Sequence, residues 1–329
     1  MKIESHSYFL GVDVGATKTA YVIANNRGEV AHVLYDKGAN HELYGIEGSE
    51  ENLKAGIEKI VRKAGLTSND LDYIFYGAAG ADTEDDFTLL RAMYKRITPD
   101  IPFDFENDGL IALKSGTIDG KGIVITCGSG NTNFAANGKG KIKRIGGLAP
   151  HSGDLLGAYC IAGYACSAAV RSEDGRDYPS VLTKLFLQEF EVNAVEELSN
   201  IGLTSPNVER MIRILFEAAE MGDGKALEIT WMLVKEILTL VKEFHHALFS
   251  PDEKIKLVLE GAVFKAKFPP LIRMLELAVH QKYKATIVIP EWDPALGALF
   301  FALEKNGIPL DKALTDTIIR TYLERKDTA

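Results

Sequence analysis

One pattern occurs twice in this chain and limits its fold more than any other feature. Residues 7–23 predict two apolar strands joined by a tight turn that carries glycine, and residues 29–35 predict a third strand. Residues 122–145 follow the same order, with a glycine-rich first turn that carries hydroxyl side chains. The residues themselves differ between the two copies, but the repeated three-strand meander indicates an internally duplicated architecture.

The segments between and after these meanders have helical periodicity. Apolar residues recur at helical spacing over residues 52–64 and 87–96, and strands are predicted between them. The second half is more helical, with long amphipathic segments over residues 207–221 and 225–249. Strands that alternate with helices predict an α/β fold. The natural junction between domains lies at residues 116–122.

Composition narrows the class of partner and the compartment. The 329 residues carry a formal net charge of -9, which argues against nucleic acid or an anionic membrane surface as the main partner. No apolar run is long enough to span a bilayer, and the first residues are polar where a signal peptide has an apolar core. Three cysteines are too few for a disulfide framework. We therefore expect a cytoplasmic protein that binds neither nucleic acid nor membrane.

The first glycine turn contains the groups that a triphosphate requires. Gly15 lets backbone N–H groups approach phosphate oxygens, Thr17 and Thr19 add hydroxyl donors, and Lys18 adds a positive charge. Asp13 at the strand end is suited to hold Mg²⁺ through water, because Mg²⁺ keeps part of its hydration shell. Taken alone, a glycine turn after a strand is more often an ordinary hairpin.

The second glycine turn has similar ingredients without the aspartate. Gly128, Ser129 and Gly130 follow an apolar strand, as Gly15 does in the first copy. The chain contains neither a P-loop nor a dinucleotide-binding glycine fingerprint. Two such hairpins could clamp one polyphosphate from both sides, so the pair predicts nucleotide binding better than either turn alone.

The ordered motifs over most of the chain resemble the N-acetylglucosamine kinase-like branch of the sugar kinase–actin–heat-shock ATPase superfamily, which shares its domain with the BadF/BadG/BcrA/BcrD ATPase family. The resemblance implies two duplicated actin-like (ribonuclease H-like) domains around an interdomain cleft. Residues 1–117 would form the N-terminal domain, with a C-terminal helix at 294–329 that packs back on it. Residues 118–293 would form the second domain, with helical insertions.

The same resemblance implies roles for individual residues. Asp108 matches the catalytic base, although an aspartate at the start of a helix is more often an N-cap. The two turns would hold ATP with Mg²⁺, and Gly261 and Ala262 match the adenosine motif. The positions that match sugar contacts are Asn40, His41, Asp82, Gly147 and Asp154. The chain would then be an ATP-dependent kinase of an amino sugar or hexose.

Two departures from the family pattern fall in the sugar-facing region. Leu155 replaces an acidic residue, and Leu148 replaces a tryptophan. Two alternatives therefore stay open at this point: an ATPase that activates a radical dehydratase, and a non-catalytic sensor of nucleotide or sugar. The radical-dehydratase activators have a cysteine-containing segment that is missing from this sequence. The sequence is compatible with a homodimer. It does not identify the sugar.

Overall fold

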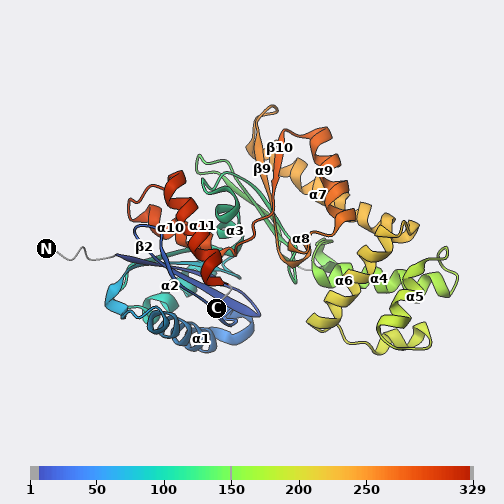
Figure 1. Cartoon of the computed structure of the whole chain (residues 1–329), viewed down its shortest axis with the longest axis horizontal. Helices are drawn as coiled ribbons and strands as arrows, with labels where there is room; N and C mark the ends of the chain where they lie inside the picture. The colour runs from blue at the N-terminus through green and yellow to red at the C-terminus, as the bar shows by residue number, and fades with distance from the viewer. Residues whose placement is uncertain (1–6, 149, 327–329) are drawn as a thin grey trace. The chain divides into compact units, whose positions relative to one another are not determined.

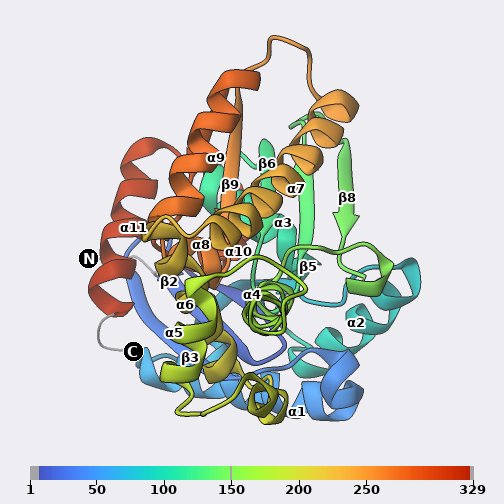
Figure 2. The same cartoon turned by 90° about the vertical axis from the view of Figure 1, so that its right-hand side faces the viewer.

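The computed structural model describes residues 7–148 and 150–326. The chain forms two compact units: unit 1 comprises Met1–Lys121 and Pro290–Ala329, and unit 2 comprises Gly122–Ile289. In Figures 1 and 2, unit 1 contains the blue and red ends of the chain, while unit 2 runs from green to orange. The predicted α/β class is confirmed, and each unit is described separately below.

Unit 1 is built on a five-stranded sheet with the order β3-β2-β1-β4-β5. The first three strands form the predicted antiparallel meander, while β4 and β5 join β1 in parallel. The strands are β1 (Tyr8–Val14), β2 (Lys18–Asn25), β3 (Val30–Lys37), β4 (Leu71–Ala78) and β5 (Phe103–Asn107).

Helices cover both faces of this sheet, and side chains along a strand alternate between the two faces. Leu10 and Val12 pack with α1 (His41–Lys63) and α2 (Glu84–Ile97). On the opposite face, Phe9 packs with the two C-terminal helices. The two C-terminal helices are α10 (Ala295–Lys305) and α11 (Lys312–Lys326). Helix α3 (Asp108–Thr117) contributes Ile111 to the same core.

The C-terminal segment differs from the single helix predicted at 294–329. It forms α10 and α11, separated at Gly307, which has a φ of +74° and ends the first helix. Gly11 allows α10 to approach β1, since a Cβ there would lie 2.4 Å from the Ala295 carbonyl oxygen. Residues 327–329 lie outside the described part of the chain.

Unit 2 repeats the topology of unit 1. Its five-stranded sheet has the order β10-β9-β6-β7-β8, again an antiparallel meander followed by two parallel strands. This match confirms the predicted internal duplication. The strands are β6 (Gly122–Thr126), β7 (Thr132–Ala136), β8 (Ile142–Gly146), β9 (Ile255–Glu260) and β10 (Ala285–Val288).

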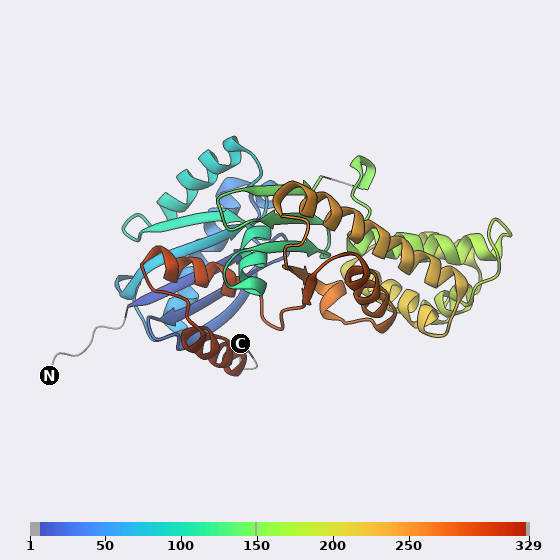
Figure 3. The same cartoon turned by 90° about the horizontal axis from the view of Figure 1, so that it is seen from above.

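Helices make up most of the remainder of unit 2 and share one apolar core with its sheet. Helix α7 packs against β7 and β8, and α4 packs against α5, α6 and α7 (Figure 3). The helices are α4 (Ala158–Glu173), α5 (Val181–Glu189), α6 (Ser205–Glu220), α7 (Gly224–Leu248), α8 (Ala262–Lys265) and α9 (Pro269–Lys282). Short 3₁₀ helices are η1 (Ser68–Asp70) in unit 1, and η2 (Pro150–Ser152) and η3 (Val195–Asn200) in unit 2. Within residues 7–148 and 150–326, every helix is too short or too polar to cross a bilayer.

Candidate active site

The carboxyl edge of the unit 1 sheet collects several of the predicted functional residues. In the parallel pairing, Asp13 lies opposite Gly77, and Ala78 lies opposite Asn107. Adjacent strands are about 4.8 Å apart, so Asp13 and the end of β5 are separated by roughly 10 Å across the edge. The fold therefore brings Asp13 and Asp108 to one edge, although 94 residues separate them in the sequence.

Asn107 decides how the chain enters α3. Its side-chain oxygen accepts a hydrogen bond from Gly109 N at 2.8 Å, and this makes Asn107 the N-cap. Its amide donates to Asp82 Oδ1 at 2.9 Å. Asp108 is consequently the first residue of the helix and not its cap. The N-cap role that the sequence suggested as an alternative for Asp108 is therefore taken by Asn107.

The β1–β2 turn is a tight hairpin whose polar residues divide between surface and core. Gly15 N donates to the Lys18 carbonyl oxygen at 3.1 Å, and Thr17 is exposed. The Lys18 ammonium lies 4.9 Å from the centre of the Tyr35 ring, in a cation–π contact. Thr19 differs from the prediction in position, because it is fully buried in β2 and not exposed at the turn.

A second group in unit 1 contains the predicted sugar residues Asn40, His41 and Asp82. Asn40 caps α1 by accepting from Glu42 N at 2.7 Å, which places His41 in the first helical turn instead of a loop. His41 Nε2 lies 3.6 Å from Asp86 Oδ1, and its ring packs on Gly80 in the loop that leads to Asp82. The tertiary structure therefore gathers His41, Asp82 and Asn107 around the end of β4.

Asp86 fixes this group by holding the loop that carries Asp82. Asp86 Oδ2 accepts hydrogen bonds from Thr83 N at 2.8 Å and Thr83 Oγ1 at 2.7 Å, and a longer one from Asp82 N. Hydrogen bonding from the Thr83 hydroxyl is the largest cause that lowers the pKa of Asp86 below its usual value. Asp86 is thus a charged anchor behind Asp82 and His41, and the sequence analysis had not singled it out.

The β6–β7 turn of unit 2 presents its glycines and Ser129 to the surface. Its base is closed by Thr126, whose hydroxyl donates to the Thr132 carbonyl oxygen at 2.6 Å and accepts from Thr132 N at 2.9 Å. Ser129 and Gly130 are exposed, and their N–H groups donate to no other described residue. The turn therefore offers backbone donors where a phosphate oxygen could accept them.

The glycines of this turn meet a condition that a phosphate cradle requires. A Cβ built at Gly128 or Gly130 would meet no atom within 4 Å, and neither residue has a positive φ. Nothing in the described part of unit 2 therefore requires glycine at these positions. A ligand that approaches the backbone closely does require it.

Gly261, in contrast, is required by unit 2 itself. Its φ is +106°, and a Cβ would lie 2.4 Å from the Cys127 carbonyl oxygen. Cys127 N donates to the Glu260 carbonyl oxygen at 2.8 Å, so the end of β9 lies directly beside the phosphate turn. The predicted adenosine residues Gly261 and Ala262 thus adjoin Gly128 in the structure. The buried Glu260 carboxylate forms an ion pair with Lys265 at 2.6 Å.

Asp154 anchors the segment that leaves β8. Its Oδ2 accepts from Leu148 N at 2.7 Å, and a Cβ on Gly146 would lie 2.8 Å from its Oδ1. Gly147 N donates to the Asn131 carbonyl oxygen at 2.7 Å, which connects this segment to the phosphate turn. Asp154 does not cap α4, because the N-cap is Gly157. Gly147 and Asp154 therefore lie close to Asn131, which follows Gly130 in the phosphate turn.

Glu236 on α7 is a carboxylate near Asp154 that sequence reasoning missed. Burial and then the negative charge of Asp154 raise the pKa of Glu236 above its usual value. No local motif marks it, because 81 residues separate it from Asp154 and it lies within a long amphipathic helix. Leu155, which follows Asp154 in the chain, is exposed. Unit 2 thus supplies a second acidic group from a different element.

Comparisons with known proteins identify the family and similar sequences. The sequence profile of the BadF/BadG/BcrA/BcrD ATPase family matches residues 10–302. The chain is 26% identical over 320 residues to an N-acetyl-D-glucosamine kinase of Dictyostelium discoideum, covering 92% of this chain and 99% of that protein. It is 25% identical over 300 residues to an N-acetylmuramic acid/N-acetylglucosamine kinase of Clostridium acetobutylicum, covering 90% and 98%.

Solved structures share the fold. A candidate N-acetylglucosamine kinase from Chromobacterium violaceum superposes with a TM-score of 0.68 at 22% identity, covering 90% of this chain and 98% of that one. A ROK family glucokinase from Streptomyces griseus, solved with glucose and AMPPNP, has a TM-score of 0.60 at 16% identity, covering 90% and 99%. The likeness places both units of this chain in the two-domain fold of those kinases.

Proposed function

Because the chain belongs to the BadF/BadG/BcrA/BcrD ATPase family, we propose that it is an ATP-dependent kinase that phosphorylates a hydroxyl group of an amino sugar or hexose. Two relatives that it matches over nine-tenths of its length are an N-acetyl-D-glucosamine kinase and an N-acetylmuramic acid/N-acetylglucosamine kinase. The observation that carries the proposal is the carboxyl edge of the unit 1 sheet, where Asp13, Asp82 and Asp108 come from three successive parallel strand ends.

The chemistry suits these residues. Phosphoryl transfer passes through a loose transition state, so catalysis depends mainly on positioning and on neutralising charge. In this proposal Asp108 accepts the proton of the attacking sugar hydroxyl, and its place in the first turn of α3 keeps the carboxylate at the sheet edge. A carboxylate of ordinary acidity suffices as base, because the hydroxyl proton is transferred late.

The nucleotide would be held by backbone donors. Ser129 and Gly130 in unit 2, and the exposed Thr17 in unit 1, would contact phosphate oxygens. Bound Mg²⁺ would neutralise charge on the phosphates, and Asp13 would hold it through water. Within the described residues, no three side chains of His, Cys, Asp or Glu converge to enclose a metal ion, so water would complete the coordination. That one nucleotide bridges both turns stays a prediction of the sequence.

The sugar would be bound by carboxylate and imidazole groups. Asp82 and His41 in unit 1 and Asp154 in unit 2 are suited to sugar hydroxyls, because carboxylates accept from neighbouring donors. We expect N-acetylglucosamine or glucosamine, with Leu148 and Leu155 changing the sugar-facing surface. The cytoplasmic location and the homodimer that the sequence left open remain predictions.

The test is a measurement of ADP release with ATP and four sugars: glucose, glucosamine, N-acetylglucosamine and N-acetylmannosamine. We expect sugar-dependent turnover that falls about 10²–10⁴-fold in Asp108→Asn. Asp85→Asn is the matched control, because Asp85 is an exposed carboxylate in the first turn of α2. Wild-type turnover in Asp108→Asn would remove Asp108 as the base, and ADP release that no sugar stimulates would overturn the kinase assignment.

A further inference from the structure

A surface cavity in unit 2 lies outside the residues assigned above. It has a volume of about 400 Å³ and lies between α4 and the N-terminal part of α7. Pockets that bind small molecules commonly have volumes of 300–1,000 Å³. Its lining includes Ala168, Arg171, Ile229, Trp231, Met232 and Lys235. The span from Lys225 to Lys235 along α7 makes this groove about 15 Å long, at 1.5 Å per residue.

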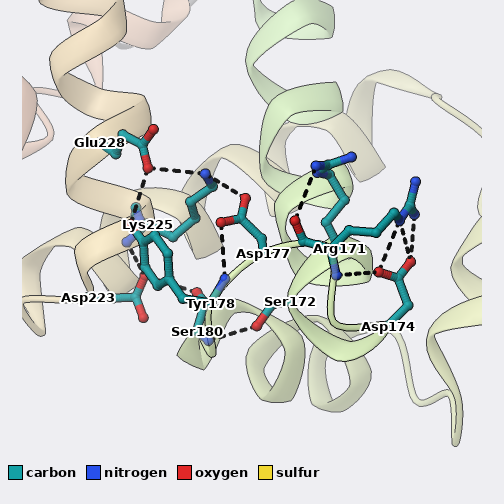
Figure 4. Close-up of polar contacts among 11 residues, drawn as sticks. Arg171, Ser172, Asp174, Asp177, Tyr178, Ser180, Asp223, Lys225 and Glu228 are labelled. Atoms are coloured by element: carbon teal, nitrogen blue, oxygen red, sulfur yellow. Dashed lines mark hydrogen bonds and ion pairs between the residues drawn. The ribbon is translucent and has the colours of Figure 1, made fainter.

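The two acidic groups of the groove both pair with one lysine. Lys225 Nζ lies 2.6 Å from Asp177 Oδ2 and 3.0 Å from Glu228 Oε2, as Figure 4 shows. Tyr178 closes this cluster by contacting Glu228 through its hydroxyl at 3.1 Å. Hydrogen bonding from Lys225 is the largest cause that lowers the pKa of Asp177. These two carboxylates are therefore committed to Lys225.

Two other cations of the groove have no such carboxylate. The nearby Asp174 is held by Arg176, with Nε at 2.8 Å and Nη2 at 2.5 Å from Oδ2 (Figure 4). Arg171 instead donates to the Arg176 carbonyl oxygen at 3.3 Å, which orients its guanidinium. In the described part of the chain, neither Arg171 nor Lys235 has a carboxylate within 4.0 Å. The charged side chains of the lining sum to +1, because Arg171, Lys225 and Lys235 face only Asp177 and Glu228. Arg171 and Lys235, one on each helix, are the two cations of the lining without a carboxylate contact among the described residues.

The lining of the groove also contains apolar and aromatic side chains. Trp231 is 42% exposed, which is unusual for a tryptophan on a helix that otherwise packs into the core. Ala168, Ile229 and Met232 line the same groove. An exposed indole beside apolar side chains binds flat apolar groups, and unpaired arginine and lysine bind anions.

We propose that this groove is a binding site for a small organic anion with a flat apolar body, and that α4 connects it to the phosphate turn. Helix α4 begins where Ala158 N donates to the Gly128 carbonyl oxygen at 2.8 Å. Tyr164, which lines the groove, lies 3.2 Å through its hydroxyl from the Leu155 carbonyl oxygen, next to Asp154. A ligand in the groove therefore contacts the helix that supports the β6–β7 turn.

The binding test uses naphthalene-1-sulfonate as the probe and naphthalene-1-methanol as its neutral counterpart, titrated calorimetrically into the full chain. We expect the sulfonate to bind at least about tenfold more tightly than the alcohol, and the double variant Arg171→Gln/Lys235→Gln to lose that advantage. The matched control is Arg273→Gln/Lys282→Gln, which removes two exposed charges from α9 outside the groove. Equal binding of the two probes, or sulfonate binding that survives the groove variant, overturns the site.

The connection through α4 has a separate readout that does not depend on kinase activity. Hydrogen–deuterium exchange of residues 126–132 is compared with and without the sulfonate, in the wild type and in the groove variant. Slower exchange in the wild type alone supports the connection. Binding without any change in exchange overturns the connection through α4, whereas failure of the sugar-dependent ADP assay would bear only on the proposed kinase function.

Discussion

The β1–β2 turn of unit 1 and the β6–β7 turn of unit 2 occupy the same place in the duplicated topology, after the first strand of each sheet. They use glycine differently. In unit 1 a Cβ on Gly15 would lie 2.6 Å from the Lys18 carbonyl oxygen, and one on Gly38 would lie 2.1 Å from the Ala16 carbonyl oxygen. In unit 2 a Cβ on Gly128 or Gly130 would meet nothing within 4 Å.

The difference separates two meanings of a glycine in a turn. Gly15 is needed so that the hairpin can close, whether or not anything binds to it. Gly128 and Gly130 have no such requirement in the described residues, so their lack of a side chain matters to what the turn binds. A glycine motif in the sequence does not distinguish these cases, because both read as a strand followed by a glycine turn. The following predictions break or sharpen this contrast.

The largest expected effect is on activity at the unit 2 turn. Gly128→Ala places a methyl group where the backbone would approach phosphate, so we expect kcat/KM for ATP to fall about 100-fold while the free energy of unfolding changes by less than about 0.5 kcal/mol. Steady-state kinetics and urea unfolding measure the two quantities. Gly163→Ala is the control, because Gly163 lies in α4 with no atom near its would-be Cβ, and we expect it to keep activity. Marked destabilisation by Gly128→Ala would contradict the contrast.

The corresponding change in unit 1 should act mainly on stability. Gly15→Ala brings its Cβ against the Lys18 carbonyl oxygen at 2.6 Å, so the hairpin must shift. We expect the free energy of unfolding to fall by about 2 kcal/mol, measured by urea denaturation. An unchanged unfolding midpoint would show that glycine is as dispensable to the fold here as at Gly128.

The third prediction compares Asp86 of unit 1, a carboxylate that holds a loop, with its exposed neighbour Asp85. Asp86 has a pKa below its usual value, chiefly through the Thr83 hydroxyl, so its stabilisation is present above the unfolded-state pKa and is lost as the pH falls through the lowered pKa. We expect Asp86→Ala to lower stability by about 1 kcal/mol at pH 7, as for loss of a capping box, and by much less in acid. Thermal unfolding across pH checks this, with the exposed Asp85→Ala as control.

The smallest effect, of opposite sign, belongs to Glu236 in unit 2. Burial and the charge of Asp154 raise its pKa, so the stability that it contributes is present in acid and is lost as the pH rises through the raised pKa. Glu236→Gln should therefore raise the melting temperature slightly at pH 7–8 and leave it unchanged well below pH 4. Glu243→Gln, an exposed change on the same helix, should show no such pH dependence. A lower melting temperature for Glu236→Gln at pH 8 would refute the assigned direction.

Local patterns were enough to predict the strands, the turns and their duplication. Alternation along β1, with Leu10 and Val12 on one face and Phe9 on the other, is a property of consecutive residues. The burial of Thr19 was harder to foresee. It follows exposed Lys18 in β2, a strand that is buried on both faces, and alternation places it on the face of Tyr21 and Ile23. Composition of the turn suggested a hydroxyl donor, while the register of the strand determined which way it points.

Helix starts were predicted less well, since a cap depends on one hydrogen bond. Asn40 begins α1 well before the apolar periodicity at Leu53, and Asn107 takes the cap that the sequence offered to Asp108. Glu236 and Asp86 escaped notice for different reasons. Glu236 matters through Asp154, a neighbour in space, and a carboxylate in an amphipathic helix looks like an ordinary surface residue. Asp86 forms a capping box with Thr83, which is a local pattern that the sequence analysis did not single out.

The sequence by itself determined the two meanders, the α/β class and the order of the motifs, because strand alternation and turn chemistry depend on residues next to one another in the chain. Only the tertiary structure decided which of those residues meet. Parallel pairing of β1, β4 and β5 brings Asp13, Asp82 and Asp108 to one sheet edge, and the packing of α7 places Glu236 near Asp154. Such contacts depend on strand register and helix packing over distances of about 30 to 95 residues, which no local pattern encodes.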